Sequence, residues 1–207
     1  MRDVLAFAGV AAVIVVVPGP DMALVLRNGI VSGRRAALET ALGTNAGLVV
    51  WAVAAALGIA AVLHASATAF TVLKIAGAAY LVWLGVRALR DAWRGTAPHA
   101  RPAPKGQRPV ESPFRQGLLT NLLNPKVALV FTTLIPQFVE PGQPALARTL
   151  LLAAIFIAMG LLWLTFYALV VSQVGALLRR SFVRRAVDAV VGALLTALGL
   201  RLAFERR

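Results

Sequence analysis

The stretch VVVPGPDMALVL, residues 15–26, interrupts an apolar run with two prolines, a glycine and an aspartate. Its valines and leucines are typical of a membrane-spanning helix. Pro18 and Pro20 lack a backbone N–H and therefore free carbonyl groups of the preceding turn, and Gly19 lets the chain bend. In lipid, freed backbone groups are tolerated only where they face protein or a water-filled cavity. The stretch therefore predicts a broken helix that lines a cavity.

The composition predicts that this helix is one of several. The chain has 207 residues, of which 59% are apolar, and a mean hydropathy of +0.80. A span needs about 20 residues, so the length allows about six spans. Because lipid offers no hydrogen-bond partners, helices are the expected spanning structure. The fold class is therefore predicted to be an all-α, polytopic integral membrane protein, with spans near 4–26, 38–63, 68–90, 116–138, 146–171 and 183–204.

The basic residues predict an orientation. The net charge is +13, but the arginines and lysines flank the apolar stretches, which indicates the positive-inside bias of membrane proteins rather than nucleic-acid binding. They gather in the first, third and fifth connections, which we expect to be cytoplasmic. Six full spans would place both termini outside. The terminal arginines favour the opposite side, and the N-terminus would lie inside if residues 4–17 only dip into the membrane.

The chain offers little for metal or thiol chemistry. It has no cysteine, and its two histidines, His64 and His99, lack the spacing of metal ligands. We expect no metal and no cofactor. Residues 1–20 resemble a signal peptide in their basic start and apolar run, but no small-residue cleavage pattern follows, so we expect them to be retained.

The two halves of the chain resemble each other. The segment PDMALVL at 20–26 matches PKVALVF at 125–131, and LGVRAL at 84–89 matches LGLRLA at 198–203. Three spans per half would reverse the orientation of the second half, which is the plan of an inverted-topology repeat. Chance similarity between alanine- and leucine-rich helices is the alternative.

This repeat defines three parts. Residues 1–94 form the first three-helix repeat and residues 114–207 form the second, each with a broken first helix. Residues 95–113, GTAPHARPAPKGQRPVESP, carry five prolines and several charges. Such a segment cannot pack a core and is predicted to be a flexible cytoplasmic connection.

Charges stand beside both predicted breaks. Asn124 and Pro125 predict a second break, and Asp21 and Lys126 each follow the proline of their break. Charges within a membrane are costly and usually face the bundle interior or each other. We expect these two on opposite walls of one cavity, as an ion pair or as contacts for the ammonium and carboxylate of a zwitterion. Alternatively, Asp21 lies close enough to Arg27 to be solvated at the interface.

Further polar residues join this site. Asn121 and Asn124 are three residues apart and share a helix face. Asn45 lies between Gly43 and Gly47, and it serves either as a substrate contact or as an interhelical hydrogen bond. The predicted substrate-binding residues are Pro18, Gly19, Pro20, Asp21, Asn45, Asn121, Asn124, Pro125 and Lys126.

Other charges receive structural assignments. Glu39 is expected near Arg35, and Asp188 is expected to pair with Arg184 or Arg185. Small-residue faces such as Gly43 and Gly47 could pack within the chain or form a homodimer.

Several motifs resemble those of one family. PGPDMALVLRNGIVSGRRAALETALGTNAG (18–47), VLKIAGAAYLVWLGVRAL (72–89) and FRQGLLTNLLNPKVALVF (114–131) resemble the LysE/RhtB family of bacterial amino-acid exporters. The resemblance covers most of the chain and is closer to the homoserine/threonine branch than to the basic amino-acid branch. It implies multi-pass insertion in the bacterial cytoplasmic membrane and efflux of small amino acids or their derivatives by proton antiport. Asp21 is the expected proton-coupling residue, because a carboxylate removed from water can exchange a proton.

Rival functions find less support. The segment GIVSGR does not supply the nucleophile elbow of a serine hydrolase, and no HExxH motif is present. We therefore expect no enzyme. A passive channel, or an exporter of another small zwitterionic metabolite, remains the alternative, and saturation of flux and its response to a pH gradient distinguish the channel from the exporter.

Overall fold

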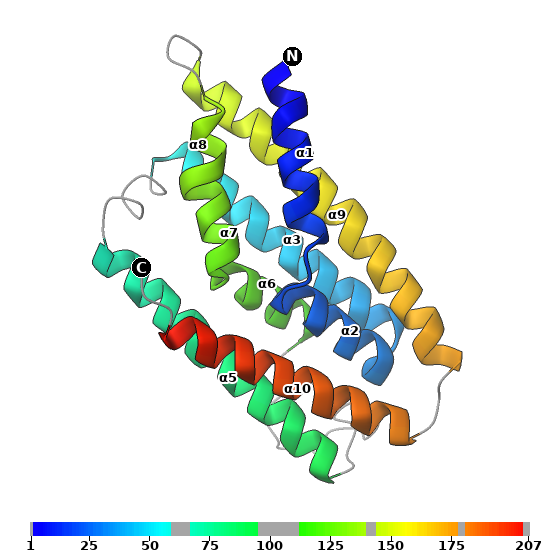
Figure 1. The fold of residues 1–207 in the computed structure, drawn as a ribbon. Helices are drawn as coiled ribbons and strands as arrows, with labels where there is room; N and C mark the ends of the chain where they lie inside the picture. The colour runs from blue at the N-terminus through cyan, green and yellow to red at the C-terminus, as the bar shows by residue number, and fades with distance from the viewer. Residues whose placement is uncertain (1, 59–66, 95–111, 140–143, 178–180, 205–207) are drawn as a thin grey trace.

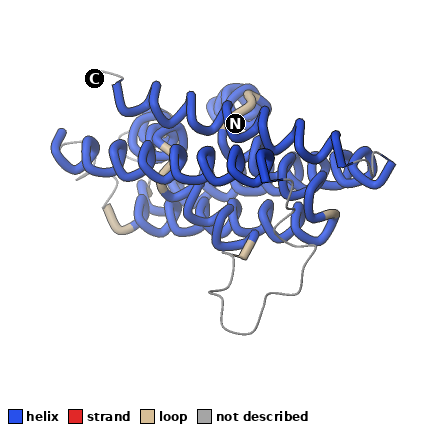
Figure 2. Tube along the Cα trace, turned by 90° about the horizontal axis from the view of Figure 1, so that it is seen from below, coloured by secondary structure: helices blue, strands red, loops and turns tan. Residues whose placement is uncertain are grey.

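The computed structural model describes residues 2–58, 67–94, 112–139, 144–177 and 181–204, and within these ranges the chain forms helices and no strand (Figures 1 and 2). Four helices are long and apolar enough to cross a membrane, and there are up to six spans if each of two bent helix pairs counts as one. The predicted all-α, polytopic membrane fold is confirmed. The helices are α1 (Arg2–Val16), α2 (Pro20–Ser32), α3 (Arg34–Ala56), α5 (Ala67–Arg94), α6 (Pro113–Leu122), α7 (Pro125–Leu129), the π-helix η1 (Val130–Leu134), α8 (Ile135–Gln137), α9 (Ala145–Leu177) and α10 (Ser181–Phe204).

The two bent pairs are the predicted broken helices. The pair α1–α2 and the pair formed by α6 with α7–α8 each bend by 49°. Gly19 is the N-cap of α2 and Asn124 is the N-cap of α7, and a proline takes the first helical position in both. Proline suits that position because its missing N–H would have no partner there. The prolines therefore end one helix and begin the next.

The order of elements is the same in both halves. A bent pair precedes two long helices in each, α3 and α5 in the first half and α9 and α10 in the second. The inverted relation between the halves, and whether residues 4–17 fully cross, stay predictions. Most of the predicted connection, residues 95–111, lies outside the described ranges, and Ser112 already caps α6 by accepting a hydrogen bond from the Arg115 N–H.

Glycines allow the closest helix contacts. A Cβ atom at Gly43 of α3 would overlap the Phe114 carbonyl of α6, and one at Gly117 of α6 would overlap the Thr40 carbonyl of α3. Gly85 and Gly192 bring α5 and α10 together in the same way. The small-residue face of α3 therefore packs within the chain.

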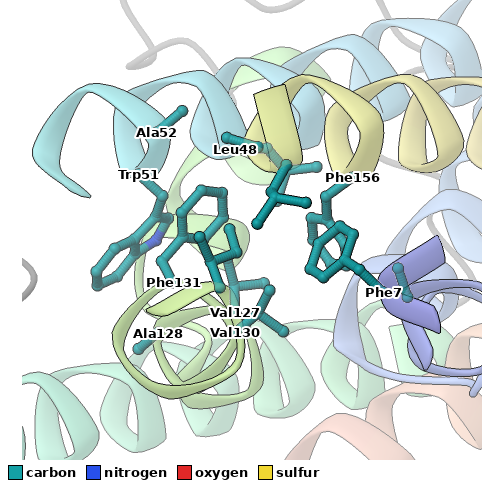
Figure 3. Close-up of a cluster of buried hydrophobic side chains, with 13 residues drawn as sticks. Phe7, Leu48, Trp51, Ala52, Val127, Ala128, Val130, Phe131 and Phe156 are labelled. Atoms are coloured by element: carbon teal, nitrogen blue, oxygen red, sulfur yellow. The ribbon is translucent and has the colours of Figure 1, made fainter. Parts of the chain in front are cut away.

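Three apolar clusters are buried among the described residues, and two of them form layers beside the broken helices. One, the aromatic layer, joins α1, α3, α7–α8 and α9 and includes Phe7, Trp51, Phe131 and Phe156 (Figure 3). The Trp51 and Phe131 rings stack with centroids 6.2 Å apart. The other, the small-residue layer, joins α2, α3 and α9 through Val25, Ala37, Ala41, Leu164 and Ala168.

One end of the bundle carries exposed arginines. Figure 1 shows that α2 ends, α3 begins, α5 ends and α10 begins on one side of the molecule. Arg34, Arg35, Arg94, Arg115 and Arg185 are exposed at the ends of α3, α5, α6 and α10. We call this side the basic end, and it is the side that the charge pattern predicts to be cytoplasmic.

Candidate functional site

A lysine from the second break reaches into the first. Lys126 Nζ donates a hydrogen bond of 3.0 Å to the Val17 carbonyl, between α1 and α2. In a continuous helix that carbonyl would accept from the N–H four residues later, at Asp21. The break removes this partner, and the lysine ammonium replaces it.

Asn124 joins the two breaks. Its side-chain oxygen accepts from the Lys126 backbone N–H at 3.0 Å and so caps α7. Its Nδ2 atom donates to Oδ2 of Asp21, also at 3.0 Å. Asp21 and Lys126 form no salt bridge in the structure; Asn124 contacts both residues instead. The expected placement of the two charges on one cavity is found, but as a bridged arrangement.

A cavity lies between the breaks. Its walls come from α1, α2, α3, α6, α7, η1 and α9. One part is polar and the rest is apolar, which is the usual make-up of a small-molecule site. The polar lining residues are Asp21, Thr44, Asn121, Asn124 and Lys126, and the others are Ile14, Val15, Val17, Gly19, Met22, Leu48, Val127, Val130, Phe156, Gly160 and Leu164.

Several polar atoms on this wall lack a partner. Within the described part of the chain, Oδ1 of Asp21, Oγ1 of Thr44 and Oδ1 of Asn121 are buried and have no hydrogen-bond partner. Most buried polar atoms in folded proteins are hydrogen-bonded, so each exception calls for an explanation. Three such atoms on one cavity wall make it a candidate site for a polar ligand.

The predicted site residues fall into three groups: residues on the cavity wall, prolines at the breaks, and Asn45. Five of them line the cavity: Gly19, Asp21, Asn121, Asn124 and Lys126. The prolines Pro18, Pro20 and Pro125 shape the breaks but are not on the wall.

Asn45 lies beside the cavity. It donates to the Ala41 carbonyl of its own helix at 2.8 Å, which is not the interhelical hydrogen bond considered above. Its Oδ1 lies close to the backbone of Gly160, where a Cβ atom would approach to 3.4 Å. Sequence reasoning did not find Gly160 or the apolar wall of α9, because the segment around Gly160, IFIAMGLL at 155–162, is apolar all round and carries no polar residue to mark the face.

Both apolar layers close the cavity. On α9, Phe156 belongs to the aromatic layer, Gly160 lines the cavity, and Leu164 belongs to the small-residue layer. The spacing of four residues puts all three on one helix face. On α3 the same order runs from Leu48 through Thr44 to Ala41. The cavity therefore sits in the middle of the bundle, with one layer on each side.

An ionic cluster lies between this site and the basic end. Arg27 of α2 is only 7% exposed. Its Nε donates to Oδ1 of Asp188 at 2.7 Å and its NH2 group donates to Oδ2 of Asp91 at 2.9 Å. Two expectations differ here. The first span was expected to end near residue 26, but α2 continues past Arg27 to Ser32. Asp188 pairs with Arg27 and not with Arg185, and the side chain of Arg184 lies outside the described residues.

Two broken helices around a partly polar cavity, inside an apolar bundle, are the features of a membrane transporter. The family model of LysE type translocators matches residues 12–206, and the chain belongs to that family, whose members are multi-pass membrane proteins.

Three curated proteins are similar to this chain over most of their length. The threonine efflux protein of Escherichia coli K12 is 34% identical over 207 residues, which cover 98% of each chain. The homoserine/homoserine lactone efflux protein of Salmonella typhimurium is 30% identical over 190 residues, 91% of this chain and 90% of the relative. The membrane protein YrhP of Bacillus subtilis is 32% identical over 208 residues, 97% and 98% of the two chains. No solved structure gives a significant match.

Proposed function

We propose that this protein exports small zwitterionic amino acids, with threonine and homoserine as the leading candidates, across the bacterial cytoplasmic membrane. The observation that carries the proposal is the cavity at the two breaks, which combines a carboxylate, an ammonium and unpartnered polar atoms. The family and the names of its threonine and homoserine efflux relatives support the same substrate class.

Each end of an amino acid has a partner in this cavity. The substrate ammonium would bind the free Oδ1 atom of Asp21, and the carboxylate would bind Lys126 once its ammonium leaves the Val17 carbonyl. A side-chain hydroxyl would donate to Oδ1 of Asn121 or bond Oγ1 of Thr44. The aliphatic part of the substrate would contact the apolar wall formed by Leu48 and Phe156.

Antiport follows if one carboxylate serves both cargoes. Asp21 would bind either the substrate ammonium or a proton, because each occupies the same negative charge. Release of substrate on one side and of a proton on the other would then alternate. The halves would rock around the cavity and open the aromatic layer and the small-residue layer in turn.

The test is counterflow in liposomes with matched substrate pairs. Threonine is compared with valine, and homoserine with norvaline, since each pair exchanges a hydroxyl for a methyl group. We expect saturable movement that favours the hydroxyl compound, because a site with unpartnered polar atoms discriminates strongly against an analogue that cannot bond them. An imposed pH gradient should accelerate it.

Two controls sharpen the test. Thr44→Val, which replaces a hydroxyl by a methyl group, should reduce the preference for threonine over valine while movement of valine persists. Flux that rises linearly with concentration and ignores the gradient would instead indicate a passive channel. No movement of any amino acid by folded protein would overturn the assignment.

A further inference from the structure

The ion pairs of Arg27 connect three helices that are distant in sequence. Arg27 lies on α2, Asp91 near the end of α5 and Asp188 near the start of α10. The side chains of Arg27 and Asp188 are 9% and 5% exposed, whereas that of Asp91 is 18% exposed. One guanidinium thus holds α2 against the packed pair α5–α10, and the bonds are shielded from water.

Burial of ion pairs does not by itself stabilise a fold. The loss of water around buried charges can exceed the attraction between them, and apolar residues often serve as well. Apolar contacts are available here, since Ala23 of α2 already packs with Leu81 of α5 and Leu195 of α10. A role in selecting one conformation therefore accounts for the charges better than a role in stability alone.

A further polar contact of α2 joins it to α3 and α6. Asn28 Nδ2 donates to Oγ1 of Thr40 on α3 at 2.8 Å and to Oε1 of Gln116 on α6 at 3.2 Å. Arg27 and Asn28 therefore hold neighbouring positions of α2 to different helices, Arg27 to α5 and α10 and Asn28 to α3 and α6. Because α2 has only 13 residues, these contacts govern where the whole helix lies.

Helix α2 forms part of the cavity wall and part of the small-residue layer. Asp21 and Met22 line the cavity at the start of α2, and Val25 belongs to the small-residue layer. Arg27 follows on the side of the basic end. A displacement of α2 would therefore move the carboxylate, open the small-residue layer and draw Arg27 away from Asp91 together.

The cluster is also built so that it can open. Arg87 and Arg94 lie near Asp91, on the same helix. If Arg27 withdraws, these arginines still compensate the Asp91 charge, and Asp91 is the more exposed of the two carboxylates. Separation of Arg27 from Asp91 thus does not leave a buried charge without compensation.

We propose that Arg27, with Asp91 and Asp188, is the latch that closes the cavity toward the basic end, and that its ion pair with Asp91 breaks when this side opens. The inference rests on the proposed transport function, since it assigns a gate to that cavity. Arg27 is a positioning residue: it does not contact the substrate, and it acts through α2.

The absence of cysteine from the chain allows a direct test of access. A single cysteine is placed at Thr44, a cavity residue that is 2% exposed. A second protein carries the cysteine at Ser112, which is exposed beside the basic end and reports which membrane face that end occupies. A membrane-impermeant thiol reagent is then applied to inside-out or right-side-out vesicles, and the labelling rate is measured on each side.

In the Thr44→Cys background, Arg27→Gln should raise the labelling rate from the basic end about tenfold, a typical size for coupling between two sites. Labelling from the opposite face should stay the same or fall. Arg27→Lys, which keeps a cation, should restore much of the low rate. Arg35→Gln is the matched control, because it removes an exposed arginine from an ion pair with Glu39 near the same end.

Each outcome decides the matter. An unchanged labelling rate in a folded Arg27→Gln protein would overturn the latch, and so would an equal rise from both faces, which would mean general loosening. If Arg27→Gln does not fold, Asp91→Asn carries the same test at the more exposed contact. The assay needs no transport, so a failed counterflow experiment with the expected labelling would refute only the proposed transport function.

Discussion

Asn124 donates a hydrogen bond of 3.0 Å to the carboxylate of Asp21, a residue 103 positions earlier in the chain. The same side chain caps α7 through its oxygen. One amide thus connects the first helix break to the second, and it orients the carboxylate on the cavity wall. This hydrogen bond therefore links the two breaks, between which the proposed substrate site lies.

The first prediction separates these two roles of Asn124. Asn124→Asp keeps an oxygen that can cap α7 but replaces the donor to Asp21 by a second carboxylate. We expect slower counterflow and a loss of about 1–3 kcal/mol in the free energy of unfolding, because the contact between the breaks becomes unsatisfied.

The double variant Asp21→Asn with Asn124→Asp provides the control. It restores the hydrogen bond with donor and acceptor exchanged, so thermal unfolding should recover most of the lost stability. Counterflow should stay slow, since the carboxylate has moved. If the double variant is as unstable as the sum of the single ones, the contact does not connect the breaks as described.

The second prediction concerns the ammonium group of Lys126. Among the described residues that line the cavity it is the single cation. Lys126→Met keeps an unbranched apolar stem of similar length but leaves the Val17 carbonyl and the substrate carboxylate without a partner. Saturable counterflow should fall at least about tenfold, which corresponds to about 1.4 kcal/mol. Arg148→Met removes a cation outside this cavity and should leave counterflow within about twofold. Equal losses in both would argue against a substrate contact at Lys126.

The third prediction assigns proton coupling to Asp21. Asp21→Asn cannot exchange a proton, so exchange of labelled substrate at equal pH should persist at a reduced rate, while acceleration by a pH gradient should disappear. The measurement is counterflow with and without the gradient in the same liposomes. Glu39→Gln, which removes an acidic group near the basic end, should respond to the gradient as the native protein does. Asp21→Asn protein that keeps the native response would refute the assignment.

Sequence reasoning located the breaks but not the ionic cluster. Proline disrupts the helix at its own position in the chain, so Pro18, Pro20 and Pro125 predict broken helices whatever the tertiary packing. A charge beside such a break is also visible in the sequence, as Asp21 and Lys126 are. Which helices then face each other is a matter of packing over long distances.

The partners of Arg27 illustrate that limit. These two aspartates lie 64 and 161 residues away, and nothing in the sequence around them distinguishes them from the other acidic residues as partners of Arg27. The one feature that could have indicated a buried Arg27 is that the helix continues beyond it to Ser32, which places the arginine inside the bundle. The π-helix η1 was not expected either. The Ile135 N–H bonds to the Val130 carbonyl there, just before Pro136, which cannot donate a hydrogen bond.

The fourth prediction tests the close contact between α3 and α6 that places Asn121 on the cavity wall. A Cβ atom at Gly43 would overlap the Phe114 carbonyl, and a backbone group cannot rotate away as a side chain can. Gly43→Ala should therefore force the helices apart and lower the free energy of unfolding by about 1–3 kcal/mol.

Gly9→Ala is the matched control for this change. Gly9 lies inside α1, where an added Cβ atom meets nothing within 4 Å. Alanine is the better helix former, so this variant should be as stable as the native protein or more stable by up to about 1 kcal/mol. Thermal unfolding in detergent and counterflow are measured on both. Because α6 leads directly to Asn124, Gly43→Ala should also slow counterflow, and a stable, fully active Gly43→Ala protein would show that the contact does not position the site.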